Sequence, residues 1–147
     1  MNIALFMKPK PLVAYLYDDY TVRQAIEKMA HHGYAAIPVI DREGHYVGTV
    51  SEGSFLWYII NGENGEIKSV DITNLEDVFL RDVPYDKRNT SVNISASIEE
   101  VYEKVLNQNF IPVVDDRDVF IGLITRSTVI QYLKKQAAIG KALDSGF

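Results

Sequence analysis

Two pairs of hydroxyl side chains stand where one apolar run ends and another apolar segment is about to begin. Thr125 and Thr128 form one pair, and Ser51 and Ser54 form the other, each pair three residues apart. A hydroxyl at the first turn of a helix lies beside unpaired backbone N–H groups, and such a setting suits a phosphate. The same position also suits a plain helix cap, because Ser and Thr hydroxyls accept hydrogen bonds from those N–H groups.

The residue after the first hydroxyl distinguishes the two pairs. Arg126 follows Thr125 and offers a charged partner for a phosphate, which favours binding at this pair. Glu52 follows Ser51 and would repel a phosphate, so binding and capping both stay open as interpretations there. The sequence therefore predicts that the two pairs are not equivalent in function.

The residue patterns give no support to catalysis, and we expect neither a catalytic nor a metal site. The chain has no cysteine, which excludes disulfides, thiol nucleophiles and cysteine-bound metals. His31 and His32 are adjacent, so on a helix they point about 100° apart, and they lack a carboxylate or cysteine partner. The aspartate pairs at 18–19 and 115–116 fall in turns, where aspartate is expected for backbone reasons.

The composition is that of a folded domain. The 147 residues are 47% hydrophobic and 24% charged, which suits one domain or two half-domains that share a core. The net charge of -5 argues against nucleic acid and against acidic membranes as partners. No apolar run approaches the ~18 residues of a membrane span, and the N-terminus lacks the order of a signal peptide, so we expect a cytoplasmic protein.

Each hydroxyl pair is predicted to follow a β-hairpin. Apolar runs at 111–114 and 119–124 flank a polar turn at 115–118, and a helix is expected from residue 129. The earlier hairpin is expected at 35–40 and 46–51, before a buried helix at 55–60.

The other expected elements precede or separate the hairpins. A helix starting at Val22, with Thr21 as its N-cap and Gly33 at its end, leads into the first hairpin. A helix capped by Ser97, with Glu100 at capping-box spacing, leads into the second. We also expect short strands at 12–16 and 91–94, a helical turn at 1–7, a short helix at 75–79 and a fraying tail at 137–147.

These elements form two copies of one unit. An offset of 74 residues maps Pro38 onto Pro112 and Gly48 onto Gly122, and it also maps one hydroxyl pair onto the other. Upstream the offset is 76, because the second copy lacks two residues near 35–36. A single copy of roughly 50 residues would hold only a marginal core. We therefore expect the copies to pack sheet to sheet, with two symmetry-related clefts between them.

The paired pattern resembles a tandem cystathionine-beta-synthase (CBS) domain pair, or Bateman module, of the stand-alone type. The residues that carry the resemblance are 33–41 with 47–51 in the first copy, and 110–115 with 121–126 in the second. It spans about residues 12–136. It implies an α/β (α+β) fold of two βαββα repeats packed sheet to sheet with pseudo-twofold symmetry.

The resemblance also divides the chain. Residues 1–62 are expected to hold the first repeat with an N-terminal segment, and residues 63–82 a linker with a short helix. The second repeat is expected at 83–137 and a C-terminal tail at 138–147. The linker is placed there because residues 63–73 are polar and include Gly65.

The family's binding of adenosine-containing nucleotides implies candidate residues in two clefts. In the family, the backbone before the proline reads the adenine edge, although both prolines and both aromatic residues also suit the core. The better-equipped site is expected to use Phe110, Ile111, Pro112, Thr125, Arg126, Thr128 and Arg88. The weaker site is expected to use Tyr34, Ala36, Ile37, Pro38, Ser51, Ser54 and Lys10. Positions 54 and 128 depart from the family, which often has an acidic residue there for the ribose.

Two functions follow from the resemblance. The first is a regulatory, non-enzymatic module that binds AMP, ADP, ATP or cyclic di-AMP in a cleft, needs no cofactor, and signals to a partner protein. The alternative is an interaction or dimerisation module with vestigial clefts, which the missing acidic residues and Glu52 support. In either case the helix expected at 55–60 is too apolar to be left in water, which predicts a homodimer that buries it.

Overall fold

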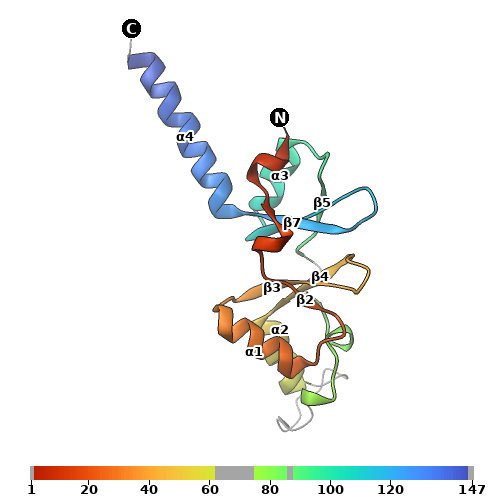
Figure 1. Ribbon diagram of the computed structural model, residues 1–147. Helices are drawn as coiled ribbons and strands as arrows, with labels where there is room; N and C mark the ends of the chain where they lie inside the picture. The colour runs from red at the N-terminus through yellow and green to blue at the C-terminus, as the bar shows by residue number, and fades with distance from the viewer. Residues whose placement is uncertain (1, 62–74, 86–87, 146–147) are drawn as a thin grey trace.

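The computed structural model describes residues 2–61, 75–85 and 88–145. Two sheets with flanking helices form a mixed α+β structure, which confirms the expected fold class (Figure 1). One sheet has the order β2-β3-β4, with strands Leu16–Tyr17, Ala36–Ile40 and Tyr46–Ser51. The other has the order β1-β7-β6-β5, in which β1 is Lys8–Pro9, β5 Val92–Asn93, β6 Phe110–Val114 and β7 Phe120–Thr125.

The described parts of the chain also contain α-helices and short 3-10 helices. The α-helices are α1 at Val22–His32, α2 at Glu52–Asn61, α3 at Ile98–Val105 and α4 at Arg126–Ser145. Short 3-10 helices lie at Ile3–Phe6, Lys10–Leu12 and Leu80–Asp82. No described helix combines the length and hydrophobicity that crossing a lipid bilayer requires.

The two repeats have the same strand pairing, which confirms the duplication. In each repeat a short strand pairs parallel with the first hairpin strand, β2 with β3 and β5 with β6. The hairpin strands then pair antiparallel and end on equivalent residue pairs, Ala36 opposite Ser51 and Phe110 opposite Thr125. The first hydroxyl of each pair is therefore the last residue of the hairpin, directly before the next helix begins.

Local signals fix the starts and ends of the helices as expected. The Thr21 hydroxyl accepts a hydrogen bond from the Gln24 N–H at 3.1 Å, and the Gln24 side chain accepts one from the Thr21 N–H at 2.9 Å. Ser97 makes the corresponding bond with the Glu100 N–H at 3.3 Å. Gly33 ends α1 with φ of 69°, a left-handed conformation that glycine adopts without steric cost.

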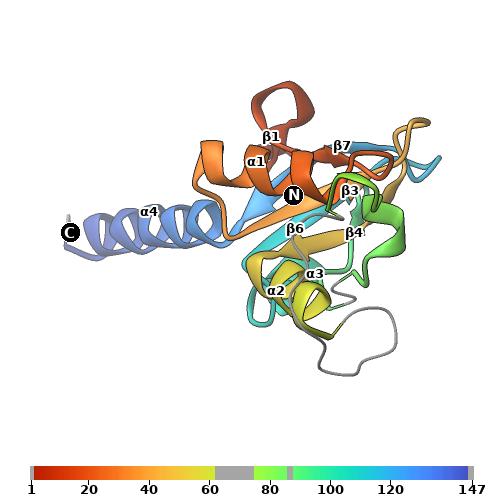
Figure 2. The same cartoon turned by 90° about the horizontal axis from the view of Figure 1, so that it is seen from below.

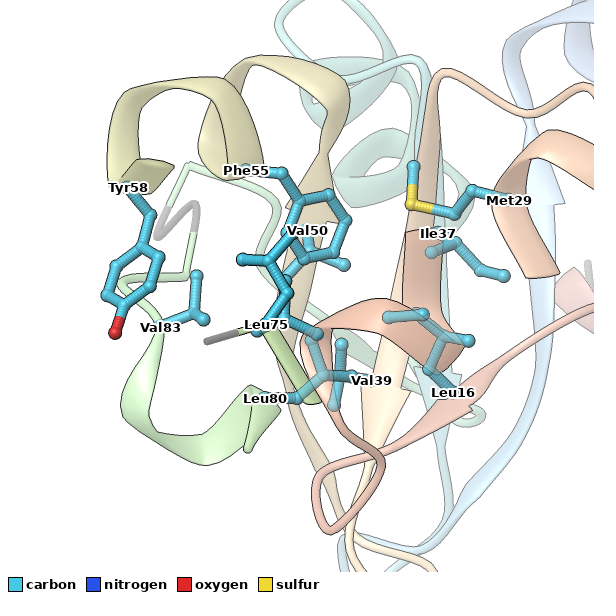
Figure 3. Close-up of a cluster of buried hydrophobic side chains, with 12 residues drawn as sticks. Leu16, Met29, Ile37, Val39, Val50, Phe55, Tyr58, Leu75, Leu80 and Val83 are labelled. Atoms are coloured by element: carbon cyan, nitrogen blue, oxygen red, sulfur yellow. The ribbon is translucent and has the colours of Figure 1, made fainter. Parts of the chain in front are cut away.

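Three apolar clusters hold the fold. The first repeat has its own core between α1, α2 and the sheet, drawn in Figure 3. The second repeat has an equivalent core around Ile111 and Ile124, both fully buried. A third cluster of Ile40, Phe110, Phe120 and Leu123 draws on both repeats. This shared cluster supports the expected packing of one repeat against the other, since burying each such side chain stabilises by about 1.5–3 kcal/mol.

Each repeat sends a segment across the sheet of the other. Strand β1 precedes the first repeat, yet it pairs antiparallel with β7 of the second, with Pro9 opposite Gly122. A Cβ at Gly122 would collide with the backbone of Lys8. Tyr85 lies near the start of the second repeat and packs on Gly48 of the first, where a Cβ would come within 2.7 Å of the Tyr85 side chain. The paired glycines of the repeat are therefore explained by these close crossings.

Several boundaries differ from the sequence predictions. The strand expected at 12–16 begins at Leu16, because Lys10–Leu12 forms a 3-10 turn. Phe79 was expected in a helix, but it pairs with Thr21 in an isolated antiparallel bridge. The tail expected to fray from residue 137 is helical, since α4 continues to Ser145. The linker at 63–73 and the proposed cap Asn74 lie outside the described residues.

Candidate functional site

A mainly apolar cleft, here called the Thr125 cleft, lies between the repeats. It has a volume of about 240 Å³, and its walls come from the start of β3 and from the facing ends of β6 and β7. Lys8, Tyr34, Asn109 and Thr125 bring polar side chains to it. The remaining lining residues are Val13, Ala14, Ala36, Ile37, Pro38, Phe110 and Leu123.

A second cleft, here called the Ser51 cleft, lies beside the first hydroxyl pair. It measures about 370 Å³ and is lined by Ser51, Gly53, Ser54, Trp57, Pro84, Tyr85 and Arg88. Among the described residues, none from β3 or β6 lines this cleft. Ser51, at the end of β4, is the one strand residue in its lining. It therefore lacks the apolar walls that the two proline-bearing strands give to the Thr125 cleft.

Both hydroxyl pairs act as helix caps. The Thr128 N–H donates to the Thr125 hydroxyl at 3.1 Å, and the two hydroxyls lie 2.8 Å apart. The Ser54 N–H donates to the Ser51 hydroxyl at 3.1 Å, with 3.0 Å between the hydroxyls. The capping interpretation is thus confirmed in both copies. It leaves room for a ligand, because a hydroxyl has two lone pairs and one proton.

Arg126 is directed at α3. Its Nε donates to the Val105 carbonyl at 2.8 Å, and its backbone N–H donates to the Asn109 carbonyl at 3.0 Å. The side chain therefore satisfies a carbonyl at the C-terminal end of α3, where a cation is favourable. Arg126 does not line the Thr125 cleft, and its expected contact with a phosphate stays a prediction.

The basic residues near the two clefts are not grouped as the sequence analysis predicts. Arg88 was grouped with Thr125, but it lines the Ser51 cleft. Lys10 was grouped with Ser51, but its ammonium lies 5.2 Å from the centre of the Tyr15 ring. Lys8 lines the Thr125 cleft instead. The crossing segments cause this exchange, because each carries the residues before one repeat across the sheet of the other.

The adenine-side residues are regrouped in the same way. Tyr34, Ala36, Ile37 and Pro38 were assigned to the weaker site, yet they share the Thr125 cleft with Phe110. Of the expected set for the stronger site, Ile111 and Pro112 are buried and do not line that cleft. The first strands of the two hairpins, β3 and β6, face one cleft from opposite sides, whereas the sequence comparison assigned one of these strands to each cleft.

Several lining residues were missed by the sequence analysis. Lys8, Val13 and Ala14 lie before the first helix of the first repeat, and Asn109 and Leu123 lie beside expected residues. Lys8 reaches the cleft only because Lys8–Pro9 pairs with β7. A strand of two residues has no readable alternation, so no sequence signal could have found it.

The perturbed ionisable groups among the described residues are explained by ion pairs, turns and burial. Bonds of 2.7 and 3.0 Å from the Arg42 guanidinium lower the pKa of the Asp19 carboxyl. Burial raises the pKa of the Tyr85 phenol, whose oxygen has no hydrogen-bond partner in the described structure.

One group of metal-ligand type lies in the first hairpin turn. The ligand atoms of Asp41, Glu43 and His45 lie within 4.8 Å of one another, a cluster that the sequence analysis did not identify. The turn itself accounts for Asp41, whose Oδ1 accepts from the N–H groups of Glu43 at 3.0 Å and His45 at 2.8 Å. Asp115 makes the equivalent bonds in the second repeat, where the sequence has Val119 in place of a histidine.

The chain belongs to the CBS domain family. Residues 4–61 and residues 75–135 each match the CBS domain. The two matches coincide with the two repeats of the fold and confirm the resemblance found in the sequence.

Two curated proteins are similar to the chain in sequence. The chain is 28% identical over 134 residues to cyclic di-AMP receptor B of Bacillus subtilis, which covers 91% of this chain and 87% of that protein. It is also 28% identical over 114 residues to a homoserine O-acetyltransferase of Methanocorpusculum labreanum, but it spans only 21% of that protein.

Solved structures share the fold. CbpB in complex with c-di-AMP superposes with a TM-score of 0.84 at 21% identity, covering 96% of this chain and 89% of that one. The c-di-AMP complex of CbpB from Listeria monocytogenes gives 0.75 at 23% identity, over 93% and 98% of the chains. CBSX2 in complex with AMP gives 0.67 at 21% identity, over 92% and 98%.

Proposed function

We propose that this protein is a regulatory, non-enzymatic module that binds an adenine nucleotide in the Thr125 cleft and reports the binding to a partner protein. The observation that carries the proposal is the lining of that cleft. Apolar side chains from both repeats form most of it, while Lys8 and Thr125 add a cation and a hydroxyl. Ligand pockets of this kind, mostly apolar with a few placed polar groups, suit a base joined to a phosphate.

The adenine base is proposed to lie between β3 and β6, the first strands of the two hairpins. Ala36, Ile37 and Pro38 come from β3, and Phe110 faces them from β6. Ala36 and Phe110 occupy equivalent positions in the two repeats. Because Ala36 has the smaller side chain, the cleft has more space on the side of the first repeat. An aromatic face opposite an aliphatic strand is a favourable environment for a purine ring.

The phosphate is proposed to lie at the start of α4. Thr125 lines the cleft and precedes the first helical residue, Arg126, so the N-terminus of α4, with its positive dipole end, lies at this end of the cleft. Lys8 supplies the positive charge in place of Arg126, whose Nε already bonds to Val105.

Cyclic di-AMP and AMP are the first ligands to consider. The relative from Bacillus subtilis is named a cyclic di-AMP receptor, and structural neighbours were solved with c-di-AMP or AMP. A hydroxyl replaces the ribose-binding carboxylate at Thr128, and that hydroxyl lies 2.8 Å from Thr125. We therefore propose recognition through the base and phosphate, with little contribution from the ribose.

A second candidate function is an interaction module without a ligand. Its supporting observation is that both hydroxyl pairs are already engaged as helix caps. In this case the clefts are remnants of the duplication and the working surface is a helix face.

A homodimer is proposed for either function. The helix expected to be apolar all round buries Phe55 and Tyr58 in its own repeat but leaves Leu56 60% and Trp57 49% exposed. A contact between copies would cover this apolar patch.

Titration calorimetry with c-di-AMP, AMP, ADP and ATP tests the nucleotide proposal directly. We expect saturable binding of at least one adenylate and no binding of the matching guanine nucleotide. Absence of heat and of any thermal shift with all four at millimolar concentration would contradict it and favour the interaction module.

A further inference from the structure

The two hairpin turns lie against each other at one end of the molecule. Figures 1 and 2 both show them side by side, on the side away from α4. His45 and Val119 form an antiparallel bridge, and the Phe120 N–H donates to the Gly44 carbonyl at 2.8 Å. This junction is distinct from both clefts described above, because it involves the opposite ends of the hairpin strands.

One flank of the junction is filled by an aromatic ring. Tyr15 stands directly before β2 and packs against the cluster that the two repeats share. Its ring centre lies 6.2 Å from that of Phe120 and 5.6 Å from that of Tyr17. The ammonium groups of Lys10 and Lys28 lie 5.2 and 5.5 Å from the same ring centre. This flank therefore holds a ring with two cations beside it, all supplied by the chain itself.

The other flank contains a cavity in place of the ring. The matching strand registers of the two repeats make Ser91 the counterpart of Tyr15, and Tyr46 the counterpart of Phe120. The cavity, here called the Ser91 pocket, measures about 450 Å³ and is lined by His45, Tyr46, Ser91, Val114 and Asp118. A serine side chain is too small to close this flank as Tyr15 closes the other.

Acidic groups dominate the rim of the Ser91 pocket. The two turns that border it, residues 41–45 and 115–119, contain five acidic residues, two arginines and one histidine. Asp118 lines the pocket itself, whereas Arg117 does not. The pocket therefore favours a cationic ligand, although its counterpart flank carries the lysines of the chain.

Two other basic side chains near the junction are bound elsewhere. Arg42 bonds to Asp19, and its guanidinium carbon lies 3.8 Å from the centre of the Tyr17 ring, on the filled flank. Lys104 donates to the Thr90 hydroxyl at 2.6 Å and does not line the pocket. Neither side chain neutralises the carboxylate that lines the Ser91 pocket.

We propose that the Ser91 pocket binds an aromatic side chain of a partner protein, a tyrosine or phenylalanine with lysine or arginine beside it in sequence. The filled flank shows the arrangement that suits this place, a ring against the junction with cations beside the ring. The partner's ring packs on Val114 and Tyr46, and its basic residues pair with Asp118 and the neighbouring turn carboxylates. The pocket gives the partner of the proposed regulatory module a place to bind, and it needs no nucleotide.

The test uses the full chain, without nucleotide, and blocked tripeptides as probes. Acetyl-Lys-Tyr-Lys-amide has the ring and the cations, acetyl-Lys-Ala-Lys-amide lacks the ring, and acetyl-Glu-Tyr-Glu-amide reverses the charge. Titration followed by amide NMR should give a dissociation constant on the order of 1 mM for the first peptide and at least tenfold weaker binding for the other two. The largest shifts should fall on His45, Ser91, Val114 and Asp118.

Filling the pocket should abolish binding without unfolding the protein. Ser91→Tyr supplies the ring that the first repeat has at Tyr15. It should weaken binding of the Lys-Tyr-Lys peptide at least tenfold and raise the midpoint of thermal unfolding by about 2–4 °C, because filling a cavity stabilises a fold. The higher midpoint would show that lost binding does not come from a damaged structure.

Removing the pocket carboxylate is a second and milder change. Asp118 has a φ of 60°, and asparagine tolerates this conformation. Asp118→Asn should therefore keep the turn and weaken binding of the Lys-Tyr-Lys peptide about threefold. Asp116→Asn is the matched control, because it removes the same charge from the same turn at a residue that does not line the pocket. It should leave the affinity unchanged.

Four results would overturn the proposal. Equal binding of the tyrosine and alanine peptides would reduce the contact to charge alone. Shifts confined to Ala36, Phe110 and Thr125 would place the peptide in the Thr125 cleft. Tyramine bound as tightly as the tripeptide would assign the pocket to a small aromatic amine. Absence of binding at 10 mM peptide would remove the site altogether, and the nucleotide proposal would stand or fall separately on its own titrations.

Discussion

The Thr125 cleft and the Ser51 cleft occupy equivalent places in the repeat but differ in every wall. Two starting strands meet at the first, and Lys8 and Thr125 lie at its edge. Among the described residues, the second is lined by Trp57, Tyr85 and Arg88 and by none from β6. Duplication therefore preserved the strand-to-helix junction in both copies while the surroundings became different sites.

The crossing segments account for most of this difference. β1 delivers Lys8 to one cleft, and the segment around Tyr85 delivers Arg88 to the other. Each segment packs on the hairpin of the other repeat, β1 against Gly122 and Tyr85 against Gly48. The asymmetry of the site thus depends on what precedes each repeat.

Filling the Thr125 cleft should cause the largest loss of nucleotide binding. In Ala36→Phe the first repeat receives the residue that the second repeat has at Phe110. We expect about a hundredfold loss of nucleotide affinity, because the added ring occupies the space of the base. Calorimetry checks this, with Ala35→Phe at an exposed neighbouring position as the control. Equal losses in both variants would point to a disturbed β3 strand.

Removing the cation should be the next largest effect. Lys8→Ala should weaken nucleotide binding by about tenfold or more, since a hydrogen bond to a charged group is worth roughly 1.5–3 kcal/mol. Lys10→Ala should change the affinity little, because Lys10 lies over the Tyr15 ring. If Arg88→Ala weakened binding and Lys8→Ala did not, the ligand would belong in the Ser51 cleft.

The hydroxyl caps separate stability from binding. Thr125→Val and Ser51→Ala should each lower the free energy of unfolding by about 1 kcal/mol through loss of a cap. Only Thr125→Val should also weaken nucleotide binding. Urea unfolding and calorimetry on the same two proteins measure both quantities. Unaltered affinity in Thr125→Val would remove this hydroxyl from the site.

Arg126 tests whether charge or packing explains the difference at the start of the last helix. Arg126→Ala should lower the free energy of unfolding by about 1 kcal/mol, because the Val105 carbonyl loses its 2.8 Å donor. Nucleotide affinity should stay within about threefold of the original value. Glu52→Ala, at the equivalent position of the first repeat, is the matched control. A larger loss of affinity would restore Arg126 to the phosphate site.

The hairpin turns should give the smallest effect. N–H groups of Arg117 and Val119 donate to the Asp115 carboxylate and lower its pKa. A lowered folded-state pKa stabilises the protein above the unfolded value near ~4, and this stability is lost as the pH falls through the folded-state pKa. Asp115→Asn should therefore flatten the acid side of the stability curve. Thermal unfolding from pH 7 to pH 2 measures the change, and an unchanged slope would contradict the assignment.

Much of the fold was readable from the sequence, whereas little of the grouping of site residues was. Thr21, Gly33 and Ser97 act within a few residues of themselves, so their roles followed from local pattern. Arg88 lines the Ser51 cleft and Tyr34 lines the Thr125 cleft, unlike the grouping made by analogy within each repeat, because the faces that meet are set by packing between repeats. The helical state of residues 137–145 was missed for another reason: residues 137–141 are exposed in the described structure and bury no apolar stripe of the kind that signals a helix in a sequence.

The sequence by itself established the duplicated unit, the order of its elements and the hydroxyl at each strand-to-helix junction. These depend on hydrophobic periodicity and on hydrogen bonds between near neighbours, both of which are written locally in the chain. Only the tertiary structure decided that Lys8, Ala36, Phe110 and Thr125 share one cleft. Those residues are distant in sequence and are brought together by the burial of one repeat against the other, a force without direction that local patterns cannot specify.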